Sequence, residues 1–420
     1  MSCCNSNIRK NKKYQYQKGS NFNYSQENNE INNSFNKNYS HEKFYEDNTP
    51  MGNNKEIGKF NESPRTLNYS DYGIVGLYNL GSCCYFNAAI QNLKNVYPFT
   101  LYILKNHKNF NKSDFAYSYC KLLANLIVQS EYQSFEPREF FDHFTKLSPN
   151  FKIGEQNDSN ICIINILNKL EKETKREGLP NPDIIDSLDK IEKEKFKDFI
   201  NKSYGKRNSY ILDYFFGFQQ DTYECRNKYC KYKNILFQGF TVLNIPIVSS
   251  KNISLDKLDD AIEYYQYKRL HKDEQGFDCP ICKKYNIQTD TKIIAYPKIL
   301  IINFKRIGEK YFYNHSVEIP PKLNLDKYRY ELIGFIKHIG GAKYGHNIAI
   351  CKNFFDNKWY VYDDSQVEEI KTFIKINIDY IPDTKHGFLY FYKKYDIFDN
   401  IDTEQEKNLI IKVSSEIKNS

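Results

Sequence analysis

The stretch GLYNLGSCCYFNAAIQNL, residues 76–93, joins a glycine-bounded turn to the start of a helix and contains two adjacent cysteines. Gly76 and Gly81 permit the tight backbone geometry of such a turn. Apolar residues then recur at helical spacing, at Phe86, Ala89, Ile90, Leu93 and Val96. This period puts Cys84 in the first helical turn, where free backbone N–H groups and the helix dipole stabilise a thiolate and lower the thiol pKa from about 8.5. The alternative for Cys84 is a small side chain packed in the core, because free cysteine is commonly buried.

Length, charge and cysteine content limit the kind of protein. The 420 residues allow a large core, and the net charge of +8 is spread along the chain without a block of lysines or arginines, so we do not expect a nucleic acid partner. The N-terminal sequence has no apolar h-region, and Pro297 and Lys298 interrupt the longest apolar run. We therefore expect a soluble intracellular protein without a transmembrane segment. Eleven cysteines in such a chain favour reduced thiols, a metal site or a catalytic thiol over a disulfide framework.

The composition divides the chain into three parts. Residues 1–70 are rich in Asn, Ser, Lys and Glu without a sustained period, which predicts a disordered tail; residues 71–394 form the folded part, and residues 395–420 are predicted to be a polar tail. Helical periodicity is present over residues 114–130, 137–147, 157–172 and 188–200, the last ending near Gly205. Strand patterns follow over residues 240–248, 298–306, 330–338, 346–352, 359–362 and 387–393. Helices followed by a mostly antiparallel sheet predict an α+β fold.

A catalytic Cys84 needs a general base, and His346 in KYGHNIAI is the best candidate among eight histidines. His346 and Asp363 lie on either side of a polar connection, so an antiparallel hairpin would set them opposite each other, about 5.5 Å apart between Cα atoms. The aspartate could then hold the imidazole tautomer while the thiolate attacks a carbonyl. Asn79 could offer an amide N–H, together with the Cys84 backbone N–H, to the resulting oxyanion. The alternatives are that His346 ends a turn and that Asn79 forms one.

Four other cysteines form two pairs near predicted strands, Cys225-x4-Cys230 and Cys279-x2-Cys282. Four thiolates suit a tetrahedral structural Zn²⁺. A redox motif at Cys279 would need a following helix in a βαβ unit, and a RING-like module would need further cysteines before Cys351. The pattern therefore predicts a zinc site made by the two pairs.

Several segments resemble the ubiquitin-specific protease family, in the family's order and from about residue 72 to residue 393. GLYNLGSCCYFNAAIQNL is similar to its cysteine box, GLxNLGNTCYMNSxLQxL, and GEQNDSNICIINILNKLEKE, residues 154–173, to its glutamine box. SYILDYFFG before Cys225, LNIPI at 243–247 and YPKILIINFKRI at 296–307 resemble finger and palm strands. YELIGFIKHIGGAKYGHNIAICKNFFDNKWYVYDDSQV, residues 330–367, resembles the histidine box, and GFLYFYK at 387–393 the terminal strand.

This resemblance implies a papain-like fold with a helical thumb, an antiparallel β palm and zinc-binding β fingers. It implies a cysteine-type deubiquitinase that hydrolyses isopeptide or peptide bonds at the C-terminal glycine of ubiquitin, with Cys84 as nucleophile, His346 as base, Asp363 as orienting acid and Asn79 as oxyanion donor. Ubiquitin and ubiquitinated proteins are the implied partners, and Asp158 falls where the family contacts the ubiquitin tail. We expect a monomer in the cytoplasm, the nucleus or both.

The sequence departs from the family pattern at several positions. Cys83 stands in place of the usual Thr, Asn347 in place of Tyr after the histidine, and the first finger pair is spaced by four residues instead of two. Asp364 could share or take over the role of Asp363. These departures keep two alternatives open: a ubiquitin-binding protein with little or no catalysis, and a hydrolase of a ubiquitin-like modifier.

Overall fold

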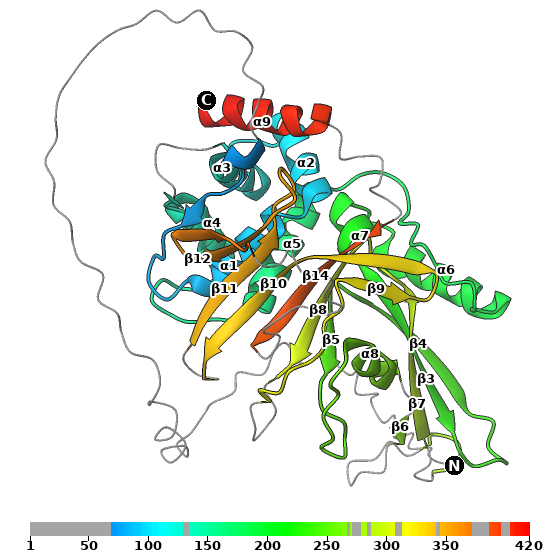
Figure 1. Cartoon of the computed structure of the whole chain (residues 1–420). Coiled ribbons are helices and arrows are strands. Elements are labelled where there is room, and N and C mark those ends of the chain that lie inside the picture. Colours follow the sequence, from blue (N-terminus) through cyan, green and yellow to red (C-terminus); the bar gives the residue numbers. More distant parts are fainter. Residues whose placement is uncertain are drawn as a thin grey trace, which may run out of the picture. The chain divides into compact units, whose positions relative to one another are not determined.

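The computed structural model describes residues 69–128, 134–266, 269–270, 279–283, 287–306, 313–341, 345–371, 386–395 and 404–420. The tail expected over residues 1–70 lies almost entirely outside these described residues. Within them, helices lie on one side of a central sheet, and a second sheet extends away from it (Figure 1).

The helices of the N-terminal half agree with the sequence pattern. They are α1 (Cys84–Lys94), α2 (Tyr97–Lys105), α3 (Phe115–Ile127), α4 (Arg138–Leu147), α5 (Ser159–Glu173) and α6 (Lys190–Tyr204), and short 3₁₀ turns cover Tyr69–Asp71 and His107–Asn109. The periodicity predicted five of these six helices to within a few residues, and α2 was not predicted. The phenylalanines of α4 pack on Phe86 of α1, with ring centroids 4.9 Å apart for Phe141 and 5.7 Å apart for Phe144. Apolar spacing along both helices thus builds the core that holds α1 in place.

The central palm sheet has eight strands. Its order is β13 (Gln366–Glu369), β12 (Trp359–Asp363), β11 (Gly345–Lys352), β10 (Tyr328–Gly340), β14 (Gly387–Lys394), β8 (Ile299–Lys305) and β5 (Val242–Pro246), with β9 (Lys322–Leu325) paired to β10. All neighbours are antiparallel except β5 and β8. The expected α+β class and the strands that the sequence pattern predicted are confirmed.

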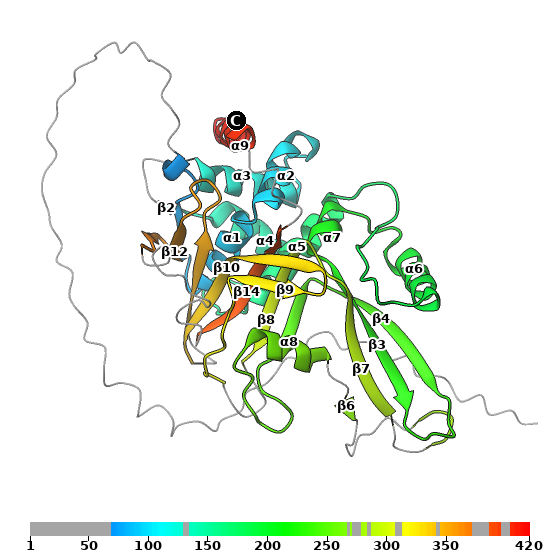
Figure 2. The ribbon, with the colours of Figure 1, turned by 45° about the vertical axis from the view of Figure 1, so that its right-hand side comes forward.

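A second sheet forms the fingers. Its order is β4 (Lys233–Phe240), β3 (Gly217–Cys225), β7 (Ile287–Ala295) and β6 (Arg269–Leu270), and Figure 2 shows β3, β4 and β7 running away from the palm. The assignment of residues 209–217 to a strand is wrong, because Tyr210–Phe215 forms helix α7, whose N-cap Ser209 accepts a hydrogen bond from the Leu212 N–H at 3.1 Å. Helix α8 (Leu258–Gln266), between β5 and β7, was also not predicted.

Helix α1 lies between the palm sheet and α5, and every one of its residues is buried. Its polar side chains pair with backbone carbonyls of the extended segment before it. Lys94 Nζ donates to Gly73 O at 2.5 Å, Gln91 Nε2 to Val75 O at 2.8 Å, and Asn87 Nδ2 to Leu77 O at 3.2 Å, so every second carbonyl of this segment accepts a hydrogen bond from α1. A helix rises about 4.5 to 6 Å over three to four residues and a strand about 6.6 Å over two, so side chains at 87, 91 and 94 can reach alternate carbonyls of the extended segment.

The C-terminal region differs from the predicted polar tail. Glu404–Lys418 forms helix α9, which packs against α2 and α3. Ile410, Val413 and Ile417 lie on one face of α9 and are buried, whereas the polar majority faces outward. The sequence analysis did not predict this helix because the average composition of the segment is polar and its apolar residues form a single stripe.

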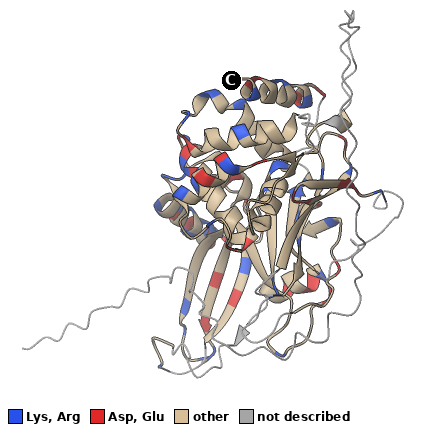
Figure 3. Cartoon of the chain, turned by 90° about the vertical axis from the view of Figure 1, so that its left-hand side faces the viewer, with Lys and Arg blue, Asp and Glu red and all other residues tan. Residues whose placement is uncertain are grey.

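The described residues contain no helix long and apolar enough to cross a membrane. Charges of both signs are interspersed over the helices and strands seen in Figure 3.

Candidate active site

The glycine turn before α1 is fixed by close backbone contact with the turn between β12 and β13. The strand β1 (Gly76–Leu77) pairs in parallel with β2 (Ser134–Phe135), and the Leu77 N–H donates to the Asp364 carbonyl at 2.7 Å. A Cβ on Gly76 would lie 2.4 Å from the Ser365 carbonyl oxygen, so only glycine fits here. The chain then turns through Gly81 and Ser82, whose φ angles are +104° and +52°. This turn delivers Cys84 to the first position of α1.

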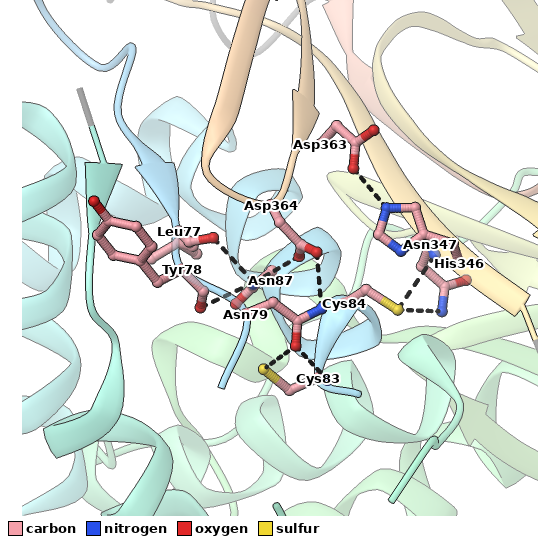
Figure 4. Close-up of polar contacts among 10 residues, drawn as sticks. All are labelled: Leu77, Tyr78, Asn79, Cys83, Cys84, Asn87, His346, Asn347, Asp363 and Asp364. Atoms are coloured by element: carbon pink, nitrogen blue, oxygen red, sulfur yellow. Dashed lines mark hydrogen bonds and ion pairs between the residues drawn. The ribbon is translucent and has the colours of Figure 1, made fainter. Parts of the chain in front are cut away.

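The Cys84 thiol lies at the helix start, and the residue is 3% exposed. The intrahelical hydrogen bonds begin with Phe86 and Asn87, whose N–H groups donate to the Cys83 carbonyl at 2.9 and 3.1 Å. The N–H groups of the first turn and the helix dipole therefore act at the position of the thiol. Figure 4 shows the Cys84 sulfur pointing toward β11, where the Asn347 backbone N–H donates to Sγ at 3.4 Å.

His346 and Asp363 form the second part of the site. His346 Nε2 lies 2.5 Å from Asp363 Oδ1, which leaves ring nitrogen Nδ1 for the thiol side (Figure 4). The hydrogen bond to Asp363 and then the contact with Cys84 raise the pKa of His346 to about 10, against the effect of burial. At neutral pH His346 is thus an imidazolium, the form that can stabilise a thiolate and later donate a proton.

The hairpin expected between His346 and Asp363 is present, but their register is offset. The β11–β12 pairs run from Lys352↔Trp359 to Ala349↔Tyr362, so Asp363 falls opposite residue 348, two positions beyond His346. The residues are therefore diagonal neighbours on one face of the sheet, and their side chains span the distance.

The two adjacent aspartates have different contacts. Asp364 Oδ2 accepts from Asn79 Nδ2 at 2.8 Å, and its Oδ1 accepts from Asn87 Nδ2 at 2.8 Å. Among the described residues, the hydrogen bond to His346 is made by Asp363. Asp364 thus holds two amides, and Asp363 holds the imidazole.

Asn79 is oriented by hydrogen bonds at both ends of its side-chain amide. Its Oδ1 accepts from the N–H groups of Gly81 and Cys83, each at 3.0 Å, and its Nδ2 donates to Asp364. An amide nitrogen carries two N–H bonds, and the hydrogen bond to Asp364 uses one of them. Asn79 is both the turn former and a side chain suited to an oxyanion.

The cysteine doublet divides into two environments. The Cys83 thiol accepts from the Leu80 N–H at 3.0 Å and donates to Asn79 Oδ1 at 3.4 Å, on the side away from His346 (Figure 4). Burial raises the pKa of the Cys83 thiol to about 11, so it stays protonated at neutral pH. Of the two thiols, Cys84 has the geometry of a nucleophile.

The two finger pairs of cysteines come together at the ends of the β3–β4 hairpin and before β7. Cys225 Sγ lies 3.6 Å from Cys282 Sγ, and Cys230 Sγ lies 3.6 Å from Cys279 Sγ; all four sulfur atoms lie within 4.8 Å of one another. These distances are too long for a disulfide bond and close to the edge of about 3.8 Å of a sulfur tetrahedron around a metal with bonds of about 2.3 Å. The cluster can therefore bind a metal ion.

The comparison with protein families decides where the chain belongs. The family model described as ubiquitin carboxyl-terminal hydrolase matches residues 75–392. The chain belongs to this family. The expected resemblance is thereby confirmed.

Relatives and solved structures of this ubiquitin carboxyl-terminal hydrolase agree with that assignment. Rat ubiquitin carboxyl-terminal hydrolase 2 is 24% identical over 321 residues, which cover 71% of this chain and 51% of the rat protein. The probable ubiquitin carboxyl-terminal hydrolase 4 of Schizosaccharomyces pombe is 23% identical over 381 residues, covering 81% of this chain and 62% of that protein. The chain thus spans between half and two thirds of the length of these relatives.

The fold of this chain is also similar to that of solved structures. The SAGA Ubp8/Sgf11/Sus1/Sgf73 DUB module bound to ubiquitin aldehyde contains a chain with a TM-score of 0.58 and 19% identity, covering 80% of this chain and 72% of that chain. The same module bound to monoubiquitin gives a TM-score of 0.58 at 19% identity, covering 79% of this chain and 71% of that chain. The expected ubiquitin-specific protease fold is therefore confirmed.

Two contacts in this site were not anticipated from the sequence. The exposed Gln156 grips the backbone just before the histidine, because its Nε2 donates to Gly345 O at 3.0 Å and its Oε1 accepts from the Gly345 N–H at 3.2 Å. The side chain of Asn347 reaches Cys84. Gln156 lies near the start of the segment that resembles the glutamine box, and this resemblance is the sequence signal for a role in the site. For Asn347 the sequence shows only a departure from the family pattern.

Proposed function

We propose that this chain is a thiol-dependent deubiquitinase with Cys84 as its nucleophile. The observation that carries the proposal is the Cys84 thiol at the start of a buried helix, next to an imidazole whose other nitrogen is bonded to Asp363. Membership of the ubiquitin carboxyl-terminal hydrolase family supports ubiquitin as the partner and the bond at its C-terminal glycine as the point of cleavage.

In the proposed reaction the Cys84 thiolate attacks the carbonyl carbon of that glycine. The oxyanion of the tetrahedral intermediate accepts hydrogen bonds from the Cys84 N–H and from the second Nδ2–H of Asn79. His346 then donates its proton to the leaving lysine amine, and the C–N bond breaks to leave a thioester. A water molecule next gives a proton to His346 and attacks the thioester, which releases the ubiquitin carboxylate and the thiolate.

Three groups around this centre have supporting roles in the proposal. Asp363 holds His346 with Nδ1 toward the sulfur and stabilises the imidazolium. Asp364 holds the Asn79 amide and so positions an oxyanion donor. Asp158, the N-cap of α5, is close enough to His338 to interact with it electrostatically, and it is proposed to bind the backbone of the ubiquitin tail.

A ubiquitin probe with an electrophile at its C-terminus tests the proposal. We expect covalent labelling at Cys84 in the native protein and in Cys83→Ser, and none in Cys84→Ala. Labelling that persists in Cys84→Ala would assign the reaction to another thiol. Affinity for ubiquitin without labelling or cleavage would instead identify a binding protein, and labelling by a probe of a ubiquitin-like modifier alone would identify a different substrate.

We further propose that the finger cysteines hold a structural Zn²⁺. Four sulfur donors at tetrahedral spacing fit this ion, which would tie the hairpin of β3 and β4 to the start of β7. Metal analysis of the purified protein should give about one zinc per chain. In Cys282→Ser we expect loss of the zinc and a lower Tm, because metal binding stabilises the fold. A protein without zinc, or an unchanged Tm in this variant, would contradict the proposal.

A further inference from the structure

The Cys84 sulfur has a second polar neighbour in addition to the groups of the proposed mechanism. Asn347 is 7% exposed, and its Nδ2 approaches Cys84 Sγ at 3.8 Å while its backbone N–H donates to the same sulfur at 3.4 Å (Figure 4). An amide N–H directed at sulfur stabilises the thiolate over the thiol. The orientation of this amide matters, because its carbonyl oxygen in the same place would disfavour the thiolate.

A second histidine controls that orientation. His338 on β10 pairs directly across from Asn347 on β11, and His338 Nδ1 lies 3.1 Å from Asn347 Oδ1. Its other nitrogen, Nε2, lies 3.1 Å from the Gly341 carbonyl oxygen. Both partners are acceptors, so both ring nitrogens must donate, and a histidine does so only as an imidazolium.

The neutral ring could not keep both hydrogen bonds. If its single N–H remained on Nε2 and faced Gly341, Nδ1 would become an acceptor and the Asn347 amide would have to turn. Its Nδ2 would then face His338 and its Oδ1 would face Cys84. If the N–H remained on Nδ1, the bond to Gly341 would be lost. Protonation of His338 is therefore coupled to the group that Asn347 presents to the sulfur.

We propose that Asn347 stabilises the Cys84 thiolate and that His338, in its charged form, is a positioning residue that holds the Asn347 amide with Nδ2 toward the sulfur. The proposal deepens the proposed function, since it rests on Cys84 being the nucleophile. The contact to the sulfur is made by a side chain at the position where the family usually has Tyr.

The packing around His338 fixes the position of its ring. A Cβ on Gly345 would lie 2.3 Å from His338 Nε2, so glycine is needed for the ring to lie against β11. Phe388 of β14 contacts the ring edge to face at 6.3 Å, and the His386 carbonyl accepts the His338 backbone N–H at 2.9 Å.

The charged neighbours of His338 are on two elements. Desolvation raises the pKa of Asp158 at the start of α5, and the positive charge of His338 lowers it, so the two groups interact electrostatically. Two further titratable residues lie close by: His346 on β11 is opposite Ile339, and His386 accepts the His338 backbone N–H through its carbonyl.

Alkylation of Cys84 by iodoacetamide tests the proposal without ubiquitin. The rate is measured from pH 5.5 to 9 on the full chain, and tandem mass spectrometry separates Cys84 from Cys83. In Asn347→Leu we expect a rate at pH 7 that is roughly threefold to tenfold lower, and a thiolate titration displaced to higher pH. His338→Gln should lower the rate in the same direction, whereas His107→Gln, a distant histidine variant, should match the native protein.

A double-variant cycle separates the relay from a direct effect of charge. If His338 acts through Asn347, His338→Gln adds no further change in the Asn347→Leu background. Full additivity, or a native alkylation profile in Asn347→Leu, would overturn the proposal. Asn347→Ser, a smaller polar replacement, repeats the measurement if the leucine variant does not fold. Because the readout is thiol reactivity, a protein that failed to cleave ubiquitin would still give a definite result.

Discussion

We expect Asp363→Asn to move the alkaline limit of activity toward neutral pH. The Asp363 carboxylate is the largest cause of the raised His346 pKa of about 10, compared with 6.5 for an ordinary histidine. The asparagine Oδ1 can still accept from Nε2–H, so the variant removes the charge and keeps the hydrogen bond. Because the His346 and Asp363 side chains are 38% and 43% exposed, solvent screens their interaction, and we expect a shift of about one to two pH units.

The direction of this shift follows from the role of the proton. His346 must be protonated to donate to the leaving amine, so activity falls as the pH rises through its pKa. The assay is kcat/KM for ubiquitin carrying a fluorogenic amide at its C-terminus, measured between pH 6 and 10.5, since this ratio reports ionisations of the free enzyme.

Asp364→Asn is the matched control, because it removes an equal charge one residue away. It should lower kcat through Asn79 and leave the alkaline limit where the native protein has it. The assignment is refuted if Asp363→Asn keeps the native limit and Asp364→Asn shifts it.

Three other changes test separate parts of the site. Asn79→Ala removes an oxyanion donor and should lower kcat about 10²- to 10³-fold with little change in KM; an unchanged kcat would exclude it from the mechanism. Cys83→Thr keeps a hydrogen-bond donor to Asn79 Oδ1 and should retain the native kcat, whereas Cys83→Ala removes the donor and should lower kcat roughly threefold to tenfold. Equal kcat values in the two variants would mean that this hydrogen bond has no effect. Burial lowers the pKa of Lys94 to about 7. Between about pH 7 and 10.5 the unfolded chain therefore binds a proton that the folded chain lacks, and the free energy of unfolding rises with pH in that window. Urea unfolding at pH 7 and pH 9 should therefore show the native protein gaining about 2 to 3 kcal/mol relative to Lys94→Met, and a constant difference would contradict the lowered pKa.

The sequence predicted the parts of the site that depend on local pattern. The period of apolar residues after Gly81 placed Cys84 at a helix start, and the short connection between residues 352 and 359 predicted the hairpin that carries His346 and Asp363. Two compact cysteine pairs likewise predicted a cluster, although nearly fifty residues separate Cys230 from Cys279. These features follow from neighbours in the chain.

Features that depend on tertiary partners were not predictable in the same way. The strands β3 and β7 carry polar residues on both faces in part of their length, so they lack the alternation of apolar and polar residues that indicates a strand. They form strands because they pair with each other. Helix α9 has one apolar stripe, and it packs against α2 and α3. The buried polar face of α1 has a similar cause, since the amide nitrogens of Asn87 and Gln91 and the Lys94 Nζ donate to carbonyls of the segment before the helix.

The different contacts of Asp363 and Asp364 arise from the turn between β12 and β13. Asp363 pairs with Gln366, so Asp364 and Ser365 form a two-residue turn, and Asp364 has a φ of +50°. Short polar residues tolerate this left-handed conformation, which suits such hairpin turns. The turn directs the second carboxylate away from the imidazole and toward the amides of Asn79 and Asn87. A sequence doublet that offers two equal candidates for orienting the histidine is thus resolved by backbone conformation, and the same turn that separates the carboxylates also lies against Gly76 and fixes the segment leading to Cys84.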